Sequence, residues 1–296
     1  MKRYRGIIYT LLSAAIFGFT PILTRLTYDG GANGITMVFL RAFLSLPVLL
    51  ALLLGMKIPL GLQKKQILQV LPVGIIGLAF TTICLYTAYS YIGVGLSTTL
   101  HYVYPIFVIV SYVLFFKQKA GWMKWLALGA GMAGVVLMLQ PGQKGNLIGI
   151  GLAVLSGATY AYYMIAIDRT GLKDMHYFKL TFYLCILSSL TSFLFGAATD
   201  NLAFPKTPTA WFYALLVSLL VSVAGLALLQ RGIALAGPSD VSILFTVEPI
   251  TSVLLGALIL REPLSARTLV GVALILASVV LVALADRNRP KTQPSA

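Results

Sequence analysis

Long apolar runs dominate the chain, and short polar or glycine-containing breaks separate them. Each run is close to the roughly 20 residues that an α-helix needs to cross the hydrocarbon core of a bilayer. The breaks have local causes, such as the turn-forming residues at 29–34 and the Gly and Pro residues near 93–95 and 237–240. The pattern predicts ten transmembrane helices, near residues 6–28, 35–55, 67–91, 96–116, 123–140, 147–167, 177–199, 209–235, 239–260 and 266–286.

The composition is that of a chain whose surface faces lipid. Hydrophobic residues make up 59% of it and charged residues only 10%, whereas an ordinary soluble domain has about 25% charged residues. The predicted fold class is therefore an all-α integral membrane protein, with the lipid bilayer as its surroundings. The net charge of +14 lies in short clusters between the apolar runs, without the basic stripe that tracks a phosphate backbone, so no nucleic-acid partner is expected.

The basic residues also predict an orientation. Most of the 22 Lys and Arg residues fall in alternate connections, beginning with Lys2, Arg3 and Arg5, and cytoplasmic loops of membrane proteins carry an excess of Lys and Arg. We expect a multi-pass protein of the cell membrane with both termini in the cytoplasm, which requires an even number of helices. The basic residues expected at the outer ends are Arg25, Arg41, Lys144, Lys206, Arg261 and Arg267. Of these, Arg25 is expected to reach the outer interface through its long stem.

The second half of the sequence repeats the first. A shift of 144 residues aligns 86–139 with 230–283 without a gap, and Pro105 then meets Pro249. Matches of Leu and Val are common by chance in apolar sequence, but matched Pro and Gly residues over such a length are less so.

Two halves of five helices each follow from this repeat, at residues 1–142 and 143–296. At a shift of 143, residues 12–14 also meet residues 155–157. Because five is odd, the halves lie in the membrane with inverted topology, an arrangement that recurs in secondary transporters. The alternative of a different class is a structural or signalling membrane protein that carries no solute.

Ionisable groups deep in an apolar run mark candidate sites, because each costs about 2.5–3.5 kcal/mol to insert. Glu248 is the one acidic residue well inside a predicted helix. On a uniform α-helix it shares a face with Phe245 and Ser252, which we expect to point inward. Glu248 could carry protons or balance a cationic group of the substrate. The structural alternative is a carboxylate that caps or hydrogen-bonds a neighbouring helix break.

Three further residues of the candidate site have polar or charged side chains inside predicted apolar helices. His101 and Tyr104 lie near the start of the fourth predicted helix, and Tyr104 is the repeat partner of Glu248. Arg41 is about six residues inside the second predicted helix, deep enough to bind a carboxylate or phosphate. Packing for His101 and extension to the interface for Arg41 remain the alternatives.

Polar and aromatic side chains extend this candidate binding site. Tyr86, Tyr160 and Tyr163 lie away from the helix ends where interfacial tyrosines gather, and Ser156 is close to the face of the last two. A cavity lined by aromatic residues suits apolar, aromatic or cationic solutes. Helix packing explains the same residues about as well.

The sequence offers no basis for enzymatic chemistry. It contains no phosphate-binding Gly-Lys loop, no paired carboxylates and no nucleophile beside a base. Cys84 and Cys185 both lie in apolar runs, and His101 and His176 are the only histidines, so neither a metal site nor a cofactor is expected. The energy for transport would come from solute or ion gradients.

With these features the chain resembles the drug/metabolite transporter superfamily, in particular its ten-helix EamA-like branch. The resemblance covers about residues 6–286. The segments that carry it are residues 6–18, Phe39-Leu40-Arg41, Val247-Glu248-Pro249, residues 260–265 and residues 271–277. In the first half, Tyr104-Pro105 stands in place of the Glu-Pro of the second.

The resemblance implies solute efflux by alternating access, with the site among the first four helices of each half and the fifth helices as peripheral supports. It also implies that Glu248 serves the fold or the mechanism as much as recognition, and that Glu262 pairs with Arg261 or Arg267. The resulting expectation is a secondary transporter, monomeric or weakly dimeric, that exports small metabolites, with amino acids as the leading class. Efflux of drugs or organic cations is the alternative.

Overall fold

Helices make up the whole of the ordered architecture. The computed structural model describes residues 2–118, 120–137, 146–259 and 265–287, and over these ranges the regular structure is helical, without strands. Eight helical segments are long and apolar enough to cross a membrane, and residues 122–137 and 266–282 form two shorter apolar helices. The chain is therefore a multi-pass helical membrane protein, as predicted.

The first half of the chain consists of segments that follow the predicted runs closely. They are α1 (Lys2–Phe17), α2 (Thr20–Tyr28), α3 (Gly34–Phe43), α4 (Leu46–Gly55), α5 (Lys64–Pro72), the π-helical segment η1 (Val73–Phe80), α6 (Thr81–His101), α7 (Tyr104–Leu114) and α8 (Trp122–Leu137).

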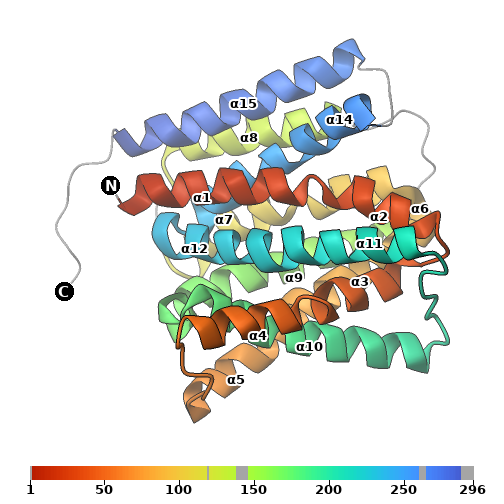
Figure 1. Cartoon of the computed structure of the whole chain (residues 1–296). Coiled ribbons are helices and arrows are strands. Elements are labelled where there is room, and N and C mark those ends of the chain that lie inside the picture. Colours follow the sequence, from red (N-terminus) through yellow and green to blue (C-terminus); the bar gives the residue numbers. More distant parts are fainter. Residues whose placement is uncertain (1, 119, 138–145, 260–264, 288–296) are drawn as a thin grey trace.

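The second half has a similar series. Its segments are α9 (Leu147–Arg169), the short 3₁₀ helix η2 (Gly171–Asp174), α10 (Tyr177–Ala198), α11 (Pro208–Val217), the π-helical segment η3 (Ser218–Gly225), α12 (Leu226–Ala236), α13 (Pro238–Leu244), the 3₁₀ segment η4 (Phe245–Val247), α14 (Glu248–Ile259) and α15 (Ala266–Arg287). The start of α1 and the end of α15 lie at the same end of the bundle, on the left in Figure 1.

The break predicted near residues 93–95 separates two candidate membrane spans, Lys64–Ile92 and Leu96–Leu114. Thr81 and His101 lie at the two ends of α6, yet they contact Thr159 and Ser156, which are one turn apart on α9. The chain therefore reverses direction within α6, because a straight helix of about 20 residues would separate its ends by about 30 Å. The corresponding Gly237 leaves the helix with a φ of +85°. The predicted boundary between residues 142 and 143 and the expected pairing of Glu262 lie outside the described residues.

Four interrupted helices resume at a proline. Pro21, Pro47, Pro105 and Pro249 each occupy the second position of a helix, in α2, α4, α7 and α14 respectively. Proline has no N–H and its φ is fixed near −65°, so it fits the first turn of a helix but cannot continue the preceding one. These prolines therefore place helix ends, with their free backbone groups, in the interior of the bundle.

Helices from the two halves pack in matching pairs. α1 contacts α12 and α6 contacts α9, while α3 lies on α10 and α8 on α15. A Cβ added at Gly6 would lie 2.9 Å from the Ala236 nitrogen, and one added at Gly149 would lie 2.6 Å from the Tyr91 Cβ. Small residues at such crossings let helix backbones approach closely within a membrane.

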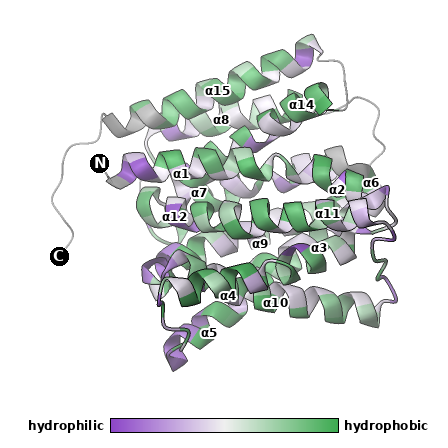
Figure 2. Ribbon diagram, in the orientation of Figure 1, coloured by the Kyte–Doolittle hydropathy of each residue, from purple (hydrophilic) through white to green (hydrophobic). Residues whose placement is uncertain are grey.

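The outer surface is apolar between two polar ends. In Figure 2 hydrophobic residues cover most of the length of the outer helices, and hydrophilic residues gather at the two ends of the bundle. Large hydrophobic side chains lie exposed on many helices, among them Leu12, Phe43, Leu68, Leu147, Leu194, Phe212, Leu258 and Val280. A surface of this kind is matched by lipid rather than water.

Candidate functional site

A cavity of about 620 Å³ lies where the interrupted helices meet. It extends along α2, the middle of α6 and the last turn of α6, and it reaches the first residues of α7 and α14. Its lining residues are Phe17, Thr20, Pro21, Ile22, Thr24, Arg25, Tyr28, Arg41, Leu78, Thr81, Thr82, Leu85, Tyr86, Tyr89, Thr98, His101, Tyr102, Tyr104, Tyr160, Leu226, Glu248, Ser252 and Val253. Along α1 and α2 the lining runs from Phe17 to Tyr28, so the cavity occupies the half of the bundle remote from the N-terminus.

Arg41 is a buried cation on the wall of this cavity. It lies two turns into α3, whose first turn is capped by the Asn33 side chain through a 2.9 Å hydrogen bond from the Thr36 N–H. Only 7% of Arg41 is exposed, and within the described parts of the chain it has neither a hydrogen bond nor an ion pair. A buried guanidinium without a counter-ion is costly, and a carboxylate or phosphate suits its planar fork of donors.

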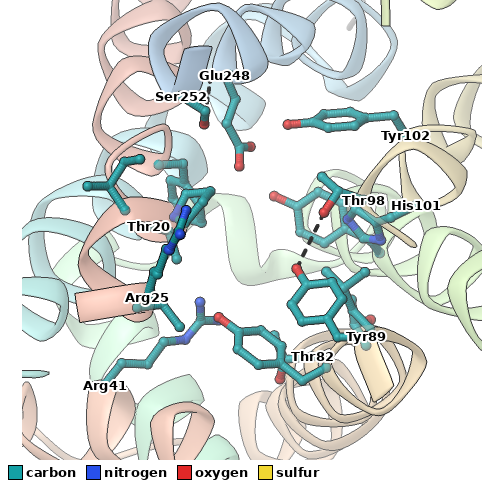
Figure 3. A pocket seen from close by; sticks show the side chains of 18 of the residues that line it. Thr20, Arg25, Arg41, Thr82, Tyr89, Thr98, His101, Tyr102, Glu248 and Ser252 are labelled. Atoms are coloured by element: carbon teal, nitrogen blue, oxygen red, sulfur yellow. Dashed lines mark hydrogen bonds between the residues drawn. The ribbon is translucent and has the colours of Figure 1, made fainter. Parts of the chain in front are cut away.

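Glu248 faces the same space from the first residue of α14. Figure 3 shows its carboxylate and the Arg41 guanidinium entering the cavity from opposite sides, with the Tyr102 hydroxyl pointing toward the carboxylate. Arg41 is close enough to Glu248 to interact with it electrostatically. Among the residues that the structure describes, neither Glu248 nor Arg41 forms an ion pair, and the polar neighbour of the carboxylate is the Tyr102 hydroxyl.

The position of Glu248 depends on the break between α1 and α2. The Ser252 hydroxyl donates a 3.0 Å hydrogen bond to the Gly18 carbonyl, which the break leaves free. A Cβ at Gly18 would lie 2.9 Å from the Glu248 carbonyl and 2.4 Å from the Thr251 Cβ. Gly18 therefore allows α14 to approach, and Ser252 ties it to the break.

An aromatic cluster forms the wall around His101. The His101 ring lies 5.5 Å from the Tyr104 ring and 5.3 Å from the Tyr160 ring, and the two tyrosines meet edge to face at 4.9 Å. The Tyr104 side chain is 1% exposed and its hydroxyl has no hydrogen-bond partner in the structure. His101 Nδ1 lies 2.9 Å from the Ser156 Oγ of α9.

Three of the ten residues predicted for the site lie behind the cavity wall. Ser156 supports His101, and Tyr163 stacks beneath Tyr160 with a centroid separation of 5.6 Å. Phe245 packs against Phe17 with its ring fully buried. Phe245 therefore contributes to the packing of α1 against the second half instead of to the cavity lining.

The structure adds residues that the sequence did not single out. Arg25 lines the cavity, although it was expected to reach the interface, and Tyr28 and Tyr89 join it. Tyr89 follows Tyr86 by three residues on one face of α6, and the two rings lie 5.0 Å apart. The spacing of three residues indicated that Tyr86 and Tyr89 share a helix face. The sequence could not indicate that Tyr28 and Arg25 line the cavity, because the direction of α2 after the break is known only from the structure.

Charged clusters close the end of the bundle nearest the N-terminus. Asp240, at the start of α13, forms ion pairs with Arg3 of α1 and Lys124 of α8. Asp168, near the end of α9, accepts a hydrogen bond from the Tyr112 hydroxyl of α7, and the Arg169 guanidinium lies 4.7 Å from the Tyr112 ring centre. Each cluster connects helices of the first half to helices of the second.

A metal centre has no support in the described ranges. Within them, no group of three or more His, Cys, Asp and Glu side chains lies close enough together to hold an ion. Cys84 and Cys185 are both buried thiols without a disulfide.

A bundle of membrane-spanning helices around a solute-sized, tyrosine-rich cavity with a few charged side chains is an arrangement typical of membrane transport proteins. Comparison with known proteins gives the same class. The description "EamA-like transporter family" matches the chain twice, over residues 4–140 and 147–284. The chain belongs to the EamA-like transporter family, and it is a transporter of that family.

Individual relatives are distant. An uncharacterized transporter of Synechocystis sp. is 28% identical over 72% of this chain, which spans 64% of that relative's length. An uncharacterized transporter of Archaeoglobus fulgidus is 26% identical over 92% of this chain and 93% of its own. A crystal structure with 16% sequence identity matches 96% of this chain and 99% of its own with a TM-score of 0.83, which shows a shared fold.

Proposed function

We propose that the chain is a secondary transporter that exports small metabolites, with amino acids as the leading class, by alternating access. The observation that carries this proposal is the pair Arg41 and Glu248, which enter one cavity from opposite sides and form no ion pair among the described residues. Amino acids carry a carboxylate and an ammonium group, which match a buried guanidinium and a carboxylate in sign. A volume of about 620 Å³ lies within the roughly 300–1,000 Å³ of small-molecule sites.

Efflux of drugs or organic cations is the second candidate. The tyrosine-rich wall and Glu248 favour it, because aromatic faces and a carboxylate both attract cations. Arg41 counts against it, since a buried positive charge repels a ligand that carries only positive charge. Arg41 therefore favours a zwitterionic substrate over one that carries only positive charge.

The two halves of the chain act as inverted repeats in this proposal. Three features at corresponding positions support it: the π-helical segments η1 and η3, the proline-led helices α7 and α14, and the contacts of Gly6 with Leu235 and of Gly149 with Tyr91. The pairing of α1 with α12 has its counterpart in that of α9 with α6. Boundaries at residues 1–142 and 143–296 and a count of ten crossings follow from the same correspondence.

Alternating access needs one end of the bundle closed while the other is open. The cavity lies in the half remote from the N-terminus, and the clusters of Asp240 and Asp168 lie at the opposite end. With both termini in the cytoplasm, as the Lys and Arg distribution predicts, this conformation faces outward in the cell membrane. Rocking of the two halves would break these clusters and open the inner end.

Proton coupling through Glu248 completes the mechanism. A carboxyl group away from bulk water can exchange a proton for a substrate ammonium group, since desolvation disfavours an uncompensated charge. The titratable and charged groups that face it are Tyr89, Tyr102, Tyr104, Tyr160 and Arg41. The proposed assembly is a monomer or weak homodimer.

Transport in liposomes is the direct test. Purified protein would be reconstituted and uptake measured for labelled amino acids and for labelled organic cations, with and without an imposed pH gradient. Saturable uptake of amino acids above that of empty liposomes is expected. Uptake of cations alone would favour the second candidate, and uptake of neither class by folded protein would overturn the proposal.

A further inference from the structure

His101 is held by a hydrogen-bond chain behind the cavity wall. The Ser156 hydroxyl lies 2.6 Å from the Ala153 carbonyl, one turn earlier in α9, and 2.9 Å from His101 Nδ1. Ser156 is fully buried, so no water competes for its hydroxyl. These two contacts fix how protons are shared between the serine and the imidazole.

The Ser156 hydroxyl donates its proton in the shorter of these two contacts, to the Ala153 carbonyl. A hydroxyl has a single proton to donate, and the Ala153 carbonyl can only accept. Ser156 Oγ must then accept from His101, so the neutral ring carries its proton on Nδ1. Nε2 is left with a lone pair, and no hydrogen bond from the described residues reaches it.

The cavity wall therefore contains two groups that can accept from a substrate ammonium group, the Glu248 carboxylate, toward which the Tyr102 hydroxyl points, and His101 Nε2. We propose that His101 Nε2 accepts an N–H of the substrate ammonium group, so that the cavity selects primary ammonium zwitterions over N-trimethylated ones. An ammonium group has three N–H donors and needs more than one acceptor, whereas a trimethylammonium group has the same charge and no donor. This inference rests on the proposed function and adds that the substrate must carry an N–H donor on its ammonium group.

Charge alone would not produce this selection. A quaternary ammonium group is attracted by Glu248 and by the faces of Tyr104 and Tyr160 as a primary one is. A hydrogen-bond acceptor distinguishes the two independently of their charge, because only the primary ammonium group can donate to it. An unsatisfied acceptor in a desolvated site rejects a ligand that cannot donate to it.

The first experiment reads the tautomer directly. The chain has two histidines, His101 and His176, so ¹⁵N-histidine labelling of the protein in lipid, together with the H176Q variant, isolates the His101 signals. A protonated Nδ1 and an unprotonated Nε2 are expected, with an Nε2 shift upon addition of glycine, alanine or phenylalanine. A protonated Nε2 in the free protein would overturn the inference.

The second experiment reads selectivity. Uptake of glycine, alanine and phenylalanine would be compared with that of their N-trimethyl betaines in wild-type, H101F and S156A protein. H101F keeps an aromatic ring and removes Nε2, so the preference for the amino acids should fall roughly tenfold. S156A removes the acceptor that holds the His101 proton on Nδ1. It should therefore also reduce the preference for the amino acids, by a smaller factor.

A matched control separates this effect from packing. Ser13 corresponds to Ser156 in the other half, is equally buried, and donates a 2.7 Å hydrogen bond to the Gly225 carbonyl. S13A should leave the preference unchanged. An unchanged preference in H101F and S156A, with amino-acid uptake intact, would overturn the inference and leave the proposed function standing. Absence of uptake in wild-type protein would overturn the proposed function instead.

Discussion

Tyr104 and Glu248 occupy corresponding positions in two helix breaks that lie 144 residues apart in the sequence. Each is the first residue of a helix, each precedes a proline, and both line the same cavity. One position carries a neutral hydroxyl and the other a carboxylate. The cavity is thus asymmetric in charge where its backbone is repeated, and the predictions below depend on that asymmetry.

Replacement of Glu248 by Gln should abolish the pH dependence of flux and leave substrate binding measurable. Glutamine keeps the size and hydrogen-bonding groups of the side chain but cannot exchange a proton. The ordinary pKa values of tyrosine and arginine lie well above neutral pH, so the tyrosines and the arginine that face Glu248 would not replace it. Uptake at several imposed pH gradients provides the measurement. The control is Y104F, which should retain the pH dependence, and full pH-dependent flux in E248Q would contradict proton coupling.

Replacement of Arg41 by Gln should weaken amino-acid binding about tenfold or more, because a hydrogen bond to a charged group contributes about 1.5–3 kcal/mol. Binding of amino-acid amides, which lack the carboxylate, should change little. Competition binding to protein in detergent measures both. Arg231 offers a control, since its guanidinium lies 5.3 Å from the Tyr177 ring centre, outside the cavity. Equal loss of amino acids and amides in R41Q would assign Arg41 to the fold.

Two glycines of α9 should respond oppositely to alanine. At Gly149 the added Cβ would meet Tyr91 at 2.6 Å and Ile92 at 2.8 Å, whereas at Gly151 nothing lies within 4 Å. G149A should therefore lower the unfolding temperature by forcing α9 away from α6. G151A should leave it unchanged or raise it, because alanine exceeds glycine in helix propensity by about 1 kcal/mol. Thermal unfolding in detergent would compare the two, and equal behaviour would argue against the close packing of α6 and α9.

Replacement of Asp240 by Asn should destabilise the closed end of the bundle. Asp240 is buried and pairs with Arg3 and Lys124, and loss of one partner from a buried ion pair costs about 3–5 kcal/mol. The unfolding temperature of D240N should fall by several degrees. The exposed Asp200 serves as the control, since D200N should have no effect. An unchanged unfolding temperature in D240N would mean that this cluster does not hold the end closed.

The sequence by itself determined that the protein lies in lipid and that it consists of membrane-spanning helices. Apolar runs of about 20 residues can satisfy their backbone groups in lipid only as helices, so residues such as 177–198 follow from composition and length. The depth of Glu248, Arg41 and His101 was equally readable, because a charged or polar group inside an apolar run is rare. Seven of the ten predicted site residues, these three among them, line the cavity.

Tertiary structure decided which way the side chains face. The Phe245 ring packs on Phe17 behind the cavity wall, and beyond the break after Phe17 the Arg25 side chain lines the cavity. Helical periodicity assumes a uniform rise and rotation, so it fails past each interruption. The proton position on His101 is a still finer matter, because Ser156 and Ala153 lie on another helix, 55 residues away in the case of Ser156. Only the packing of α9 against α6 brings them together.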